Sequence, residues 1–289
     1  MCFEFTNFKS VAFRFFKIVG FAVYLLLAML SVSTYALASD PVLEVFDGLQ
    51  HRYFKRSDLL VHEQTLEIEI RRDAAYGKPM KVQAIPVTAL LPNVATIASL
   101  QIVALDGFVA NISGGLLAGK GQAYIAIEPN DMAWPALKAG SATSAGPYYL
   151  VWLTPEKTAI SNEQWPYQIA KIVATAPLQE RFPQLLPKME TKRPLDRELR
   201  GLQVFINNCS VCHQLNGAGD ANVGPDLNRP HSPIEYFQPV YLRQLIRYPG
   251  SVRVWKQSSM PGFSQESISD AQLDDLIAYF TVMAKQRRN

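Results

Sequence analysis

One short run constrains the fold of this 289-residue chain more than any other: Cys209-Ser210-Val211-Cys212-His213. Two thiols three positions apart near the end of a helix lie on one side, where they can form thioethers with two vinyl groups of one porphyrin. The next residue then lies under the iron, so C-x-x-C-H predicts one covalent c-type haem with His213 as proximal ligand. A structural disulfide, half a zinc site or a thioredoxin-like pair would need a second Cys/His pair or a βαβ context, and neither is present.

Residues 1–38 have the pattern of a secretory signal peptide. Basic residues form its charged flank, an apolar run from Ile18 to Leu30 follows, and Ala36-Leu37-Ala38 supplies a small-x-small cleavage pattern. The alternative is an uncleaved N-terminal membrane anchor, but the apolar run is short for the roughly 20 residues that a transmembrane helix needs. We therefore expect a periplasmic protein with no stable membrane span after cleavage.

Length and composition indicate a multidomain globular protein. The sequence is 48% hydrophobic and 18% charged, and its net charge of +3 becomes nearly neutral once the basic leader is removed. A nearly neutral chain gives no indication of nucleic-acid binding. The chain has three cysteines and Cys2 belongs to the leader, so the haem takes both cysteines of the mature protein.

Residues 41–176 are predicted to form a mainly β, α+β domain. The segment from Leu66 to Ile70 alternates apolar and charged residues, as a half-buried strand does, and Asp106-Gly107 is typical of a hairpin turn. Turn-forming residues separate the other apolar runs. Further strands are expected at Met80–Val87, Leu100–Leu105, Phe108–Ile112, Gln122–Ile127, Tyr148–Leu153 and Tyr167–Ala174.

The titratable residues of this domain suggest no clear site. His51 and His62 do not belong to a ligand-spaced cluster, so both are interpreted as surface or turn residues. Four other residues are interpreted as turn and rim positions, with a pocket lining as the alternative. They are Asp106, Glu128, Asp131 and Trp134.

Four segments of this domain carry a likeness to a known fold: Phe54–Leu60, Leu105–Phe108, Gly146–Trp152 and Trp165–Ile169. Together they resemble the molybdopterin-binding domain of the sulfite-oxidase type, which implies a molybdopterin-domain-like fold. That family binds molybdenum through a cysteine thiolate, and residues 41–176 contain no cysteine. We therefore expect no molybdopterin and interpret the domain as a docking or scaffold module.

Residues 177–197 contain four prolines with charged residues between them, and no helix or strand period is visible. This composition predicts a semi-rigid, solvated linker between two domains. The alternative is that Leu185, Leu186 and Met189 pack against one of the domains.

Residues 198–289 contain several motifs around the haem-attachment run. Gly201 and Phe205 precede it on one helix face, and Gly224-Pro225-Asp226-Leu227 follows, with Pro225 twelve residues after His213. A short amphipathic helix is expected from Ile234 to Tyr248. A last helix, capped by Ser269 or Asp270, is expected to run to about Lys285 because apolar residues recur with helical spacing.

These motifs, in this order, resemble the class I cytochromes c, an all-α fold. The resemblance implies that Gly201 lets the first and last helices approach closely, with Phe205 and Tyr279 packed at their crossing. It also implies that the Pro225 carbonyl accepts a hydrogen bond from Nδ1 of His213 and fixes its tautomer. Leu227 would pack on the porphyrin.

Met260 is the predicted distal iron ligand. Its thioether is a soft, neutral donor, and Pro261 keeps it out of helical conformation, so that it can face the iron from a loop. Met283 is interpreted as a core residue of the last helix, and Met132 and Met189 lie outside the domain. His231 would give bis-His ligation with His213, but it comes directly after the proximal loop, the loop that contains Pro225. His/Met ligation raises the potential relative to His/His.

Four basic residues near Met260 support two interpretations. Either they form a basic rim that steers an acidic redox partner, or they are a solvated face. They are Arg243, Arg247, Arg253 and Lys256.

Taken together, these features favour an electron-transfer protein rather than an enzyme. We expect a periplasmic monohaem c-type cytochrome that carries single electrons through a His/Met-ligated haem, with a redox partner such as a periplasmic dehydrogenase or a terminal oxidase. One alternative is a sulfite-oxidase-like molybdenum oxidoreductase with a fused cytochrome c electron-exit domain. Another is a haem-based sensor in which Met260 is easily displaced.

Overall fold

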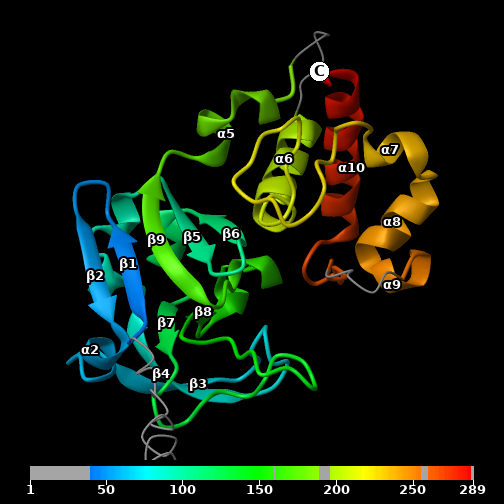
Figure 1. Ribbon diagram of the computed structural model, residues 1–289. Coiled ribbons are helices and arrows are strands. Elements are labelled where there is room, and N and C mark those ends of the chain that lie inside the picture. The colour runs from blue at the N-terminus through cyan, green and yellow to red at the C-terminus, as the bar shows by residue number, and fades with distance from the viewer. Residues whose placement is uncertain (1–39, 159, 189–195, 255–259, 288–289) are drawn as a thin grey trace, which may run out of the picture. The chain divides into compact units, whose positions relative to one another are not determined.

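The computed structural model describes residues 40–158, 160–188, 196–254 and 260–287 (Figure 1). The predicted signal peptide, Met189 and Lys256 lie outside these ranges. Residues Asp40–Asn289 belong to one compact unit. Its N-terminal part is rich in sheet and its C-terminal part is helical, which confirms the predicted succession of a mainly β and an all-α region.

The first sheet has the strand order β2-β1-β9-β5-β6. All of its pairs are antiparallel except β1 with β9, which run parallel. Sequence analysis missed β1 and β2, although alternation in β1 leaves Leu43 and Val45 fully buried. Its strands are β1 (Val42–Phe46), β2 (His51–Lys55), β5 (Ser99–Ala104), β6 (Val109–Ile112) and β9 (Ile169–Thr175).

The second sheet is antiparallel, with the order β3-β4-β7-β8. All five residues of β8 are buried, which explains why that stretch is continuously apolar. The strands lie where the sequence predicted them: β3 (Leu66–Ile70), β4 (Met80–Pro86), β7 (Ala123–Ile127) and β8 (Tyr148–Trp152).

Short helical segments join these strands. They are α2 (Arg56–Leu60), α3 (Val87–Leu90), α4 (Gly114–Leu117) and the 3₁₀ turns η1 (Val94–Thr96), η2 (Pro155–Lys157) and η3 (Asn162–Gln164). The turn η3 is held to the domain core, because the buried indole Nε1 of Trp152 donates to the carbonyl of Gln164 at 2.7 Å. This anchoring gives η3 a fixed place in the fold.

Most of the polar residues singled out in this domain occupy turns and loops, whereas His51 lies on the exposed strand β2. His62 Nδ1 accepts from the amide of Gln64 at 3.1 Å, and Asp106 Oδ1 accepts from the amide of Phe108 at 3.0 Å. Glu128 Oε1 accepts from the amide of Trp134 at 2.8 Å, so it holds a loop in place. These contacts agree with the interpretation of His62, Asp106 and Glu128 as turn and rim residues, but that interpretation is wrong for Trp134, which is buried in the hydrophobic core.

The proline-rich segment is partly helical, contrary to the expectation of no helix period in residues 177–197. It forms α5 (Leu178–Arg181) and the 3₁₀ turn η4 (Pro183–Leu185). Leu178 and Leu185 are buried in the core of the helical region, whereas Leu186 is exposed. Burial of these two leucines outweighs the solvated character of the charged residues around them, so this stretch is packed rather than free.

The helical region contains α6 (Asp196–Asn208), α7 (Pro233–Tyr236), α8 (Pro239–Arg247), α9 (Pro249–Val252) and α10 (Asp270–Lys285). The single helix expected from Ile234 to Tyr248 is divided, because Pro239 starts a new helix and cannot continue the hydrogen bonds of the one before. Ser269 caps α10 by accepting from the amide of Gln272 at 3.2 Å.

Helices α6 and α10 lie against each other (Figure 1), and Gly201 is at their contact. A Cβ atom on Gly201 would lie 2.1 Å from the carbonyl oxygen of Asp275. The rings of Phe205 and Tyr279 lie 5.8 Å apart, and the Tyr279 hydroxyl donates to the carbonyl of Leu185 at 2.8 Å. The expected contact of the first and last helices is therefore present.

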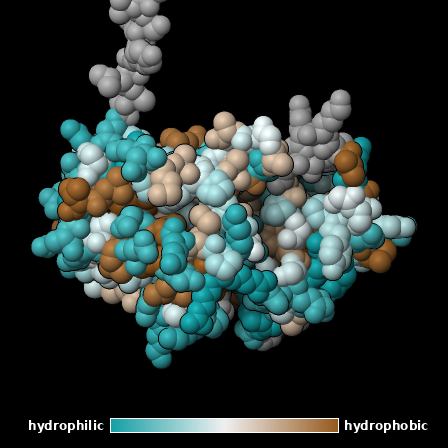
Figure 2. Space-filling model, turned by 90° about the horizontal axis from the view of Figure 1, so that it is seen from below, coloured by the Kyte–Doolittle hydropathy of each residue, from teal (hydrophilic) through white to brown (hydrophobic). Residues whose placement is uncertain are grey.

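The surface in Figure 2 is mostly hydrophilic, with hydrophobic side chains in separate patches. Within the described ranges, no helix is both long and apolar enough to cross a membrane.

Candidate haem site

The haem-attachment run forms a turn that continues directly from α6. The amide of Cys209 donates to the carbonyl of Phe205 at 2.8 Å, and the amide of His213 donates to the carbonyl of Cys209 at 2.8 Å. Helical spacing therefore persists through the run and keeps both thiols and the imidazole within one turn. Neither thiol forms a disulfide.

Burial, with a smaller contribution from the charge of Glu163, raises the pKa of both thiols to about 12. Both groups are therefore protonated thiols at neutral pH. A thiolate metal site would need the opposite shift, because positive neighbours or a metal lower a thiol pKa. Two neutral thiols on one turn suit thioether formation instead.

His213 is oriented by the loop that follows it. Its Nδ1 lies 2.7 Å from the carbonyl oxygen of Pro225. Since a carbonyl only accepts, Nδ1 must carry the hydrogen, and the lone pair of Nε2 is left for a ligand. Burial lowers the pKa of His213, which favours the neutral ring that a metal binds. The hydrogen bond implied by the family resemblance is therefore present.

A compact loop holds Pro225 in this position. The carboxylate of Asp226 accepts from the amides of Asn216 at 3.2 Å and Gly217 at 2.5 Å, so it ties the two halves of the loop together. A Cβ atom on Gly224 would lie 2.4 Å from Cε1 of His213. Sequence analysis named neither Asp226 nor Gly224 for these roles, although an aspartate after Gly-Pro is a common turn-forming signal.

Met260 and Leu227 are both partly buried and pack against the core of the helical region. The segment after Met260 is attached to α8 by the side chain of Arg247 and by a backbone hydrogen bond from Phe263 to Ile246. The guanidinium of Arg247 donates to the carbonyls of Phe263, Ser264 and Ile268 at 2.9, 3.0 and 2.5 Å. The loop that carries the predicted distal ligand therefore has a fixed attachment point.

The basic-rim hypothesis needs correction for two of its residues. Arg247 also pairs with Asp270, and its side chain is only 10% exposed. Arg243 pairs with Asp274. Both charges are used inside the domain, so Arg247 is a structural residue and neither is a free cation for a partner.

The rival ligands lie elsewhere. Met283 is buried in the core of the helical region, and Met132 is 69% exposed. The His231 side chain is 67% exposed and lies 3.9 Å from Glu235. Two thiols and an imidazole with a free Nε2 lie on one turn, which fits a covalent haem with His213 below the iron, and Met260 stays the predicted second axial ligand.

The β-rich region packs directly on the haem-attachment turn, which sequence analysis did not foresee. Val211, inside the C-x-x-C-H run, is 2% exposed and belongs to the hydrophobic core of the β-rich region, and Cys212 packs against that core. The carbonyl of Val211 accepts from the amide of Val109 on the edge strand β6, at 3.4 Å. The edge of the first sheet is therefore covered by the haem-attachment turn.

A polar network reinforces this contact. Both terminal nitrogens of Arg181 donate to the carboxylate of Asp220, at 2.5 and 2.7 Å. Asn111 donates to the same carboxylate at 3.2 Å and accepts from Arg181 at 3.0 Å. No sequence motif predicts these contacts, because they join residues far apart along the chain.

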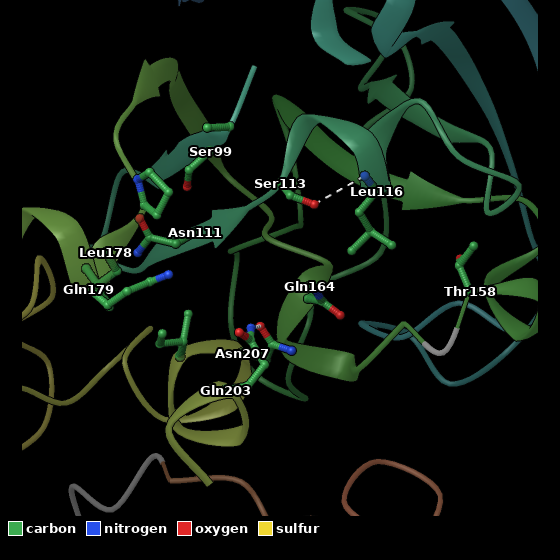
Figure 3. A pocket seen from close by; sticks show the side chains of 13 residues that line it. Ser99, Asn111, Ser113, Leu116, Thr158, Gln164, Leu178, Gln179, Gln203 and Asn207 are labelled. Atoms are coloured by element: carbon green, nitrogen blue, oxygen red, sulfur yellow. Dashed lines mark hydrogen bonds between the residues drawn. The ribbon is translucent and has the colours of Figure 1, made fainter. Parts of the chain in front are cut away.

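A cleft of about 380 Å³ lies between the β-rich region and α6 (Figure 3). It is lined on one side by residues of β5, β6 and α4 and on the other by residues of α6. Its polar side chains are uncharged amides and hydroxyls: Ser99, Asn111, Ser113, Thr158, Gln164, Gln179, Gln203 and Asn207. None of the predicted haem-site residues lines it.

Comparison with known proteins identifies the helical region. Residues 199–282 match the family model for cytochrome c. No curated protein matches the chain. The C-terminal region is therefore a cytochrome c domain, which implies a covalently bound haem c and an electron-transfer haem protein. The molybdopterin-type resemblance of residues 41–176 stays a prediction.

Proposed function

We propose that this protein is a periplasmic monohaem c-type cytochrome that carries single electrons through a His/Met-ligated haem. Cys209 and Cys212 would bind the haem covalently, His213 would be the proximal iron ligand and Met260 the distal one. Leu227 would pack against the porphyrin and Pro225 would orient His213. The observation that carries this proposal is the 2.7 Å contact from His213 Nδ1 to the Pro225 carbonyl, on the turn that bears both thiols.

A bound haem supplies a one-electron Fe(II)/Fe(III) couple. The residues of this chain hold the predicted ligands in place, which favours fast electron exchange. Pro225 and Gly224 hold the imidazole in one orientation, and Arg247 attaches the Met260 segment to α8. With both axial positions filled, a substrate would have to displace a ligand, which favours electron transfer over catalysis at the iron.

The β-rich region serves in this proposal as a docking module for a redox partner, such as a periplasmic dehydrogenase or a terminal oxidase. Support comes from its contact with the haem-attachment turn through Val211, since a partner bound to this region lies close to the electron carrier. The molybdenum alternative has no cysteine thiolate in residues 41–176 to hold the metal. Elemental analysis for molybdenum on the purified protein tests that point.

Replacement of Met260 by alanine tests the ligand set. We expect the oxidised protein to lose its Met–Fe charge-transfer band, the midpoint potential to fall, and the reduced protein to bind carbon monoxide. Met132→Ala is the matched control, because Met132 is 69% exposed and lies in the β-rich region. It should keep the spectrum and potential of the wild type.

Two results would contradict the proposal. Purified protein without the spectrum of a covalent haem would exclude haem attachment at Cys209 and Cys212. A wild-type protein whose reduced form binds carbon monoxide as readily as Met260→Ala would show that Met260 does not close the distal side, which favours a sensor.

A further inference from the structure

The cleft between the β-rich region and α6 is lined without a charged side chain. Its polar groups are hydroxyls and carboxamides, and its apolar groups are aliphatic side chains and a proline. A charged ligand would lose its hydration here and meet no opposite charge. A purely apolar ligand would leave the amides of the cleft without hydrogen bonds. The lining therefore selects for a neutral molecule that carries several hydrogen-bonding groups.

On the β-rich side, three polar side chains line the cleft (Figure 3). Gln164 is 6% exposed, and its Oε1 accepts from the amide of Ser161 at 2.9 Å, so its Nε2 is left as a donor in a fixed position. Ser99 is also 6% exposed, and its hydroxyl forms no hydrogen bond within the described part of the chain. The hydroxyl of Thr158 is buried and has no partner among the described residues. Buried polar groups are normally hydrogen-bonded, so these three indicate a place for a bound molecule.

On the opposite side, α6 presents a donor and an acceptor next to each other. Gln203 and Asn207 lie one helical turn apart, and Nε2 of Gln203 donates to Oδ1 of Asn207 at 2.9 Å. This bond leaves Nδ2 of Asn207 as a donor and Oε1 of Gln203 as an acceptor. Two hydroxyl groups on neighbouring carbon atoms can bind such a pair, because each hydroxyl both donates and accepts.

The apolar part of the lining fits the same kind of molecule. Ile206 lies on α6 beside the two amides, and Leu178 and Leu116 border the cleft from α5 and α4. The C–H face of a sugar ring can pack on such aliphatic side chains while its hydroxyls reach the amides around them. The volume of about 380 Å³ is near the lower end of the range for small-molecule sites, roughly 300–1,000 Å³, which suits a monosaccharide or a disaccharide.

We propose that this cleft binds a neutral sugar, held between the β-rich region and α6. The inference goes beyond the proposed function, since no residue predicted to bind the haem lines the cleft. The sugar is bound and not converted, because the lining residues include no carboxylate, imidazole or thiol to act as acid, base or nucleophile. A bound sugar contacts both regions at once and therefore stabilises the contact between them.

Binding is tested by titrating the holoprotein separately with glucose, galactose, maltose and sucrose, and following saturation transfer to each sugar by NMR. We expect saturable binding of at least one of them, with a dissociation constant of about 1 mM or lower. Glucosamine and glucuronate have a similar ring but carry a charge. They should bind at least about tenfold more weakly, because the cleft offers that charge no partner.

Asn207→Leu removes the donor on α6 and keeps a side chain that favours a helix. The affinity for the sugar should fall about tenfold, which corresponds to the loss of one hydrogen bond. Gln244→Leu is the matched control, because it removes a carboxamide from α8, outside the cleft. It should bind the sugar as the wild type does. The haem spectrum of each variant checks that the helical region is folded.

A second readout uses only the wild type. The amide of Val109 donates to Val211 across the contact between the two regions, so a bound sugar should slow its hydrogen exchange. With the sugar at about ten times its dissociation constant, protection of this amide should rise about tenfold. Unchanged protection would contradict a site between the two regions.

Three other results would overturn the inference: no saturable binding of any of the four sugars, equal binding of their charged counterparts, or an unchanged affinity in Asn207→Leu. Each of them leaves the proposed electron carrier intact, because the haem spectrum and the redox couple are measured without sugar.

Discussion

At the scale of single residues, the position of His213 depends on Gly224, which has no Cβ atom. A Cβ on Gly224 would lie 2.4 Å from Cε1 and 2.6 Å from Nδ1 of His213. The imidazole ring therefore rests against the backbone of the loop whose carbonyl, at Pro225, accepts its hydrogen bond. A side chain at Gly224 would force the ring or the loop to move, and either movement breaks that hydrogen bond.

Gly224→Ala should lower both haem content and stability. Overpacking of this kind costs about 1–3 kcal/mol, and displacement of His213 removes the proximal ligand from its position. The ratio of haem to protein and the midpoint of thermal unfolding measure the two effects. Gly250→Ala is the control, because no atom lies within 4 Å of a Cβ there and alanine favours the helical turn of α9. Full haem content in Gly224→Ala would contradict the argument.

At the scale of elements, α8 and the segment after Met260 behave as one piece. Arg247 donates to three carbonyls of that segment, and the amide of Phe263 donates to the carbonyl of Ile246 at 3.0 Å. A charged donor that satisfies several carbonyls, two of them partly buried, is worth more than a surface ion pair. The predicted distal ligand is therefore positioned by a helix that does not itself carry it.

Arg247→Met keeps the aliphatic stem and removes these hydrogen bonds. We expect a loss of about 1.5–3 kcal/mol in the free energy of unfolding, measured by denaturant titration. The reduced protein should also bind carbon monoxide faster, since the Met260 segment is released from α8. Arg243→Met, which removes a half-exposed pair with Asp274, should cost at most about 1 kcal/mol. Equal effects of the two substitutions would refute this role of Arg247.

At the scale of the whole molecule, two regions with different architectures pack against each other at the haem-attachment turn. Val211 lies in the core of the β-rich region, and Asp220 of the proximal loop pairs with Arg181 of α5. Burial opposes ionisation of Asp220, but hydrogen bonds and the charge of Arg181 outweigh it and hold its pKa below the usual 3.8. Asp220 is therefore ionised at neutral pH, and its ion pair with Arg181 is fully formed.

Arg181→Met should loosen this contact. Breaking a buried ion pair costs at most about 3–5 kcal/mol, because it leaves the Asp220 carboxylate without its cation. Hydrogen exchange at the amide of Val109, which donates to Val211, should speed up. Arg72→Met is the control, because it removes another pair between the two regions, Arg72 with Glu266, whose side chains are 83% and 76% exposed. Unchanged protection of Val109 in Arg181→Met would contradict this prediction.

The contact between the two regions should also depend on pH. Because the folded pKa of Asp220 is depressed, its stabilising contribution is present above about pH 4 and is lost as pH falls through the lower folded value. The protection of the Val109 amide, measured against the intrinsic exchange rate at the same pH, should therefore fall at acidic pH in the wild type, and this fall should be absent in Asp220→Asn.

The sequence by itself determined the local features. Thiols and imidazole at C-x-x-C-H spacing, alternation in β3, and the spacing of apolar residues in α10 each depend on neighbours within a few residues, which helical or strand geometry places directly. The contact at Gly201 was also predicted, because the resemblance to class I cytochromes c implies that this glycine lets the first and last helices approach closely. By contrast, residues 177–197 were predicted to be solvated, although Leu178 and Leu185 are buried.

Only the tertiary structure decided which distant side chains meet. Val211 in the β-rich core and Asp220 with Arg181 join segments whose separation along the chain carries no periodic signal. Burial and the pKa shifts that follow from it depend on the surroundings in three dimensions. The haem-attachment run thus predicts a cofactor from covalent spacing alone, whereas the contacts that join this run to the β-rich region form only when the two regions pack together.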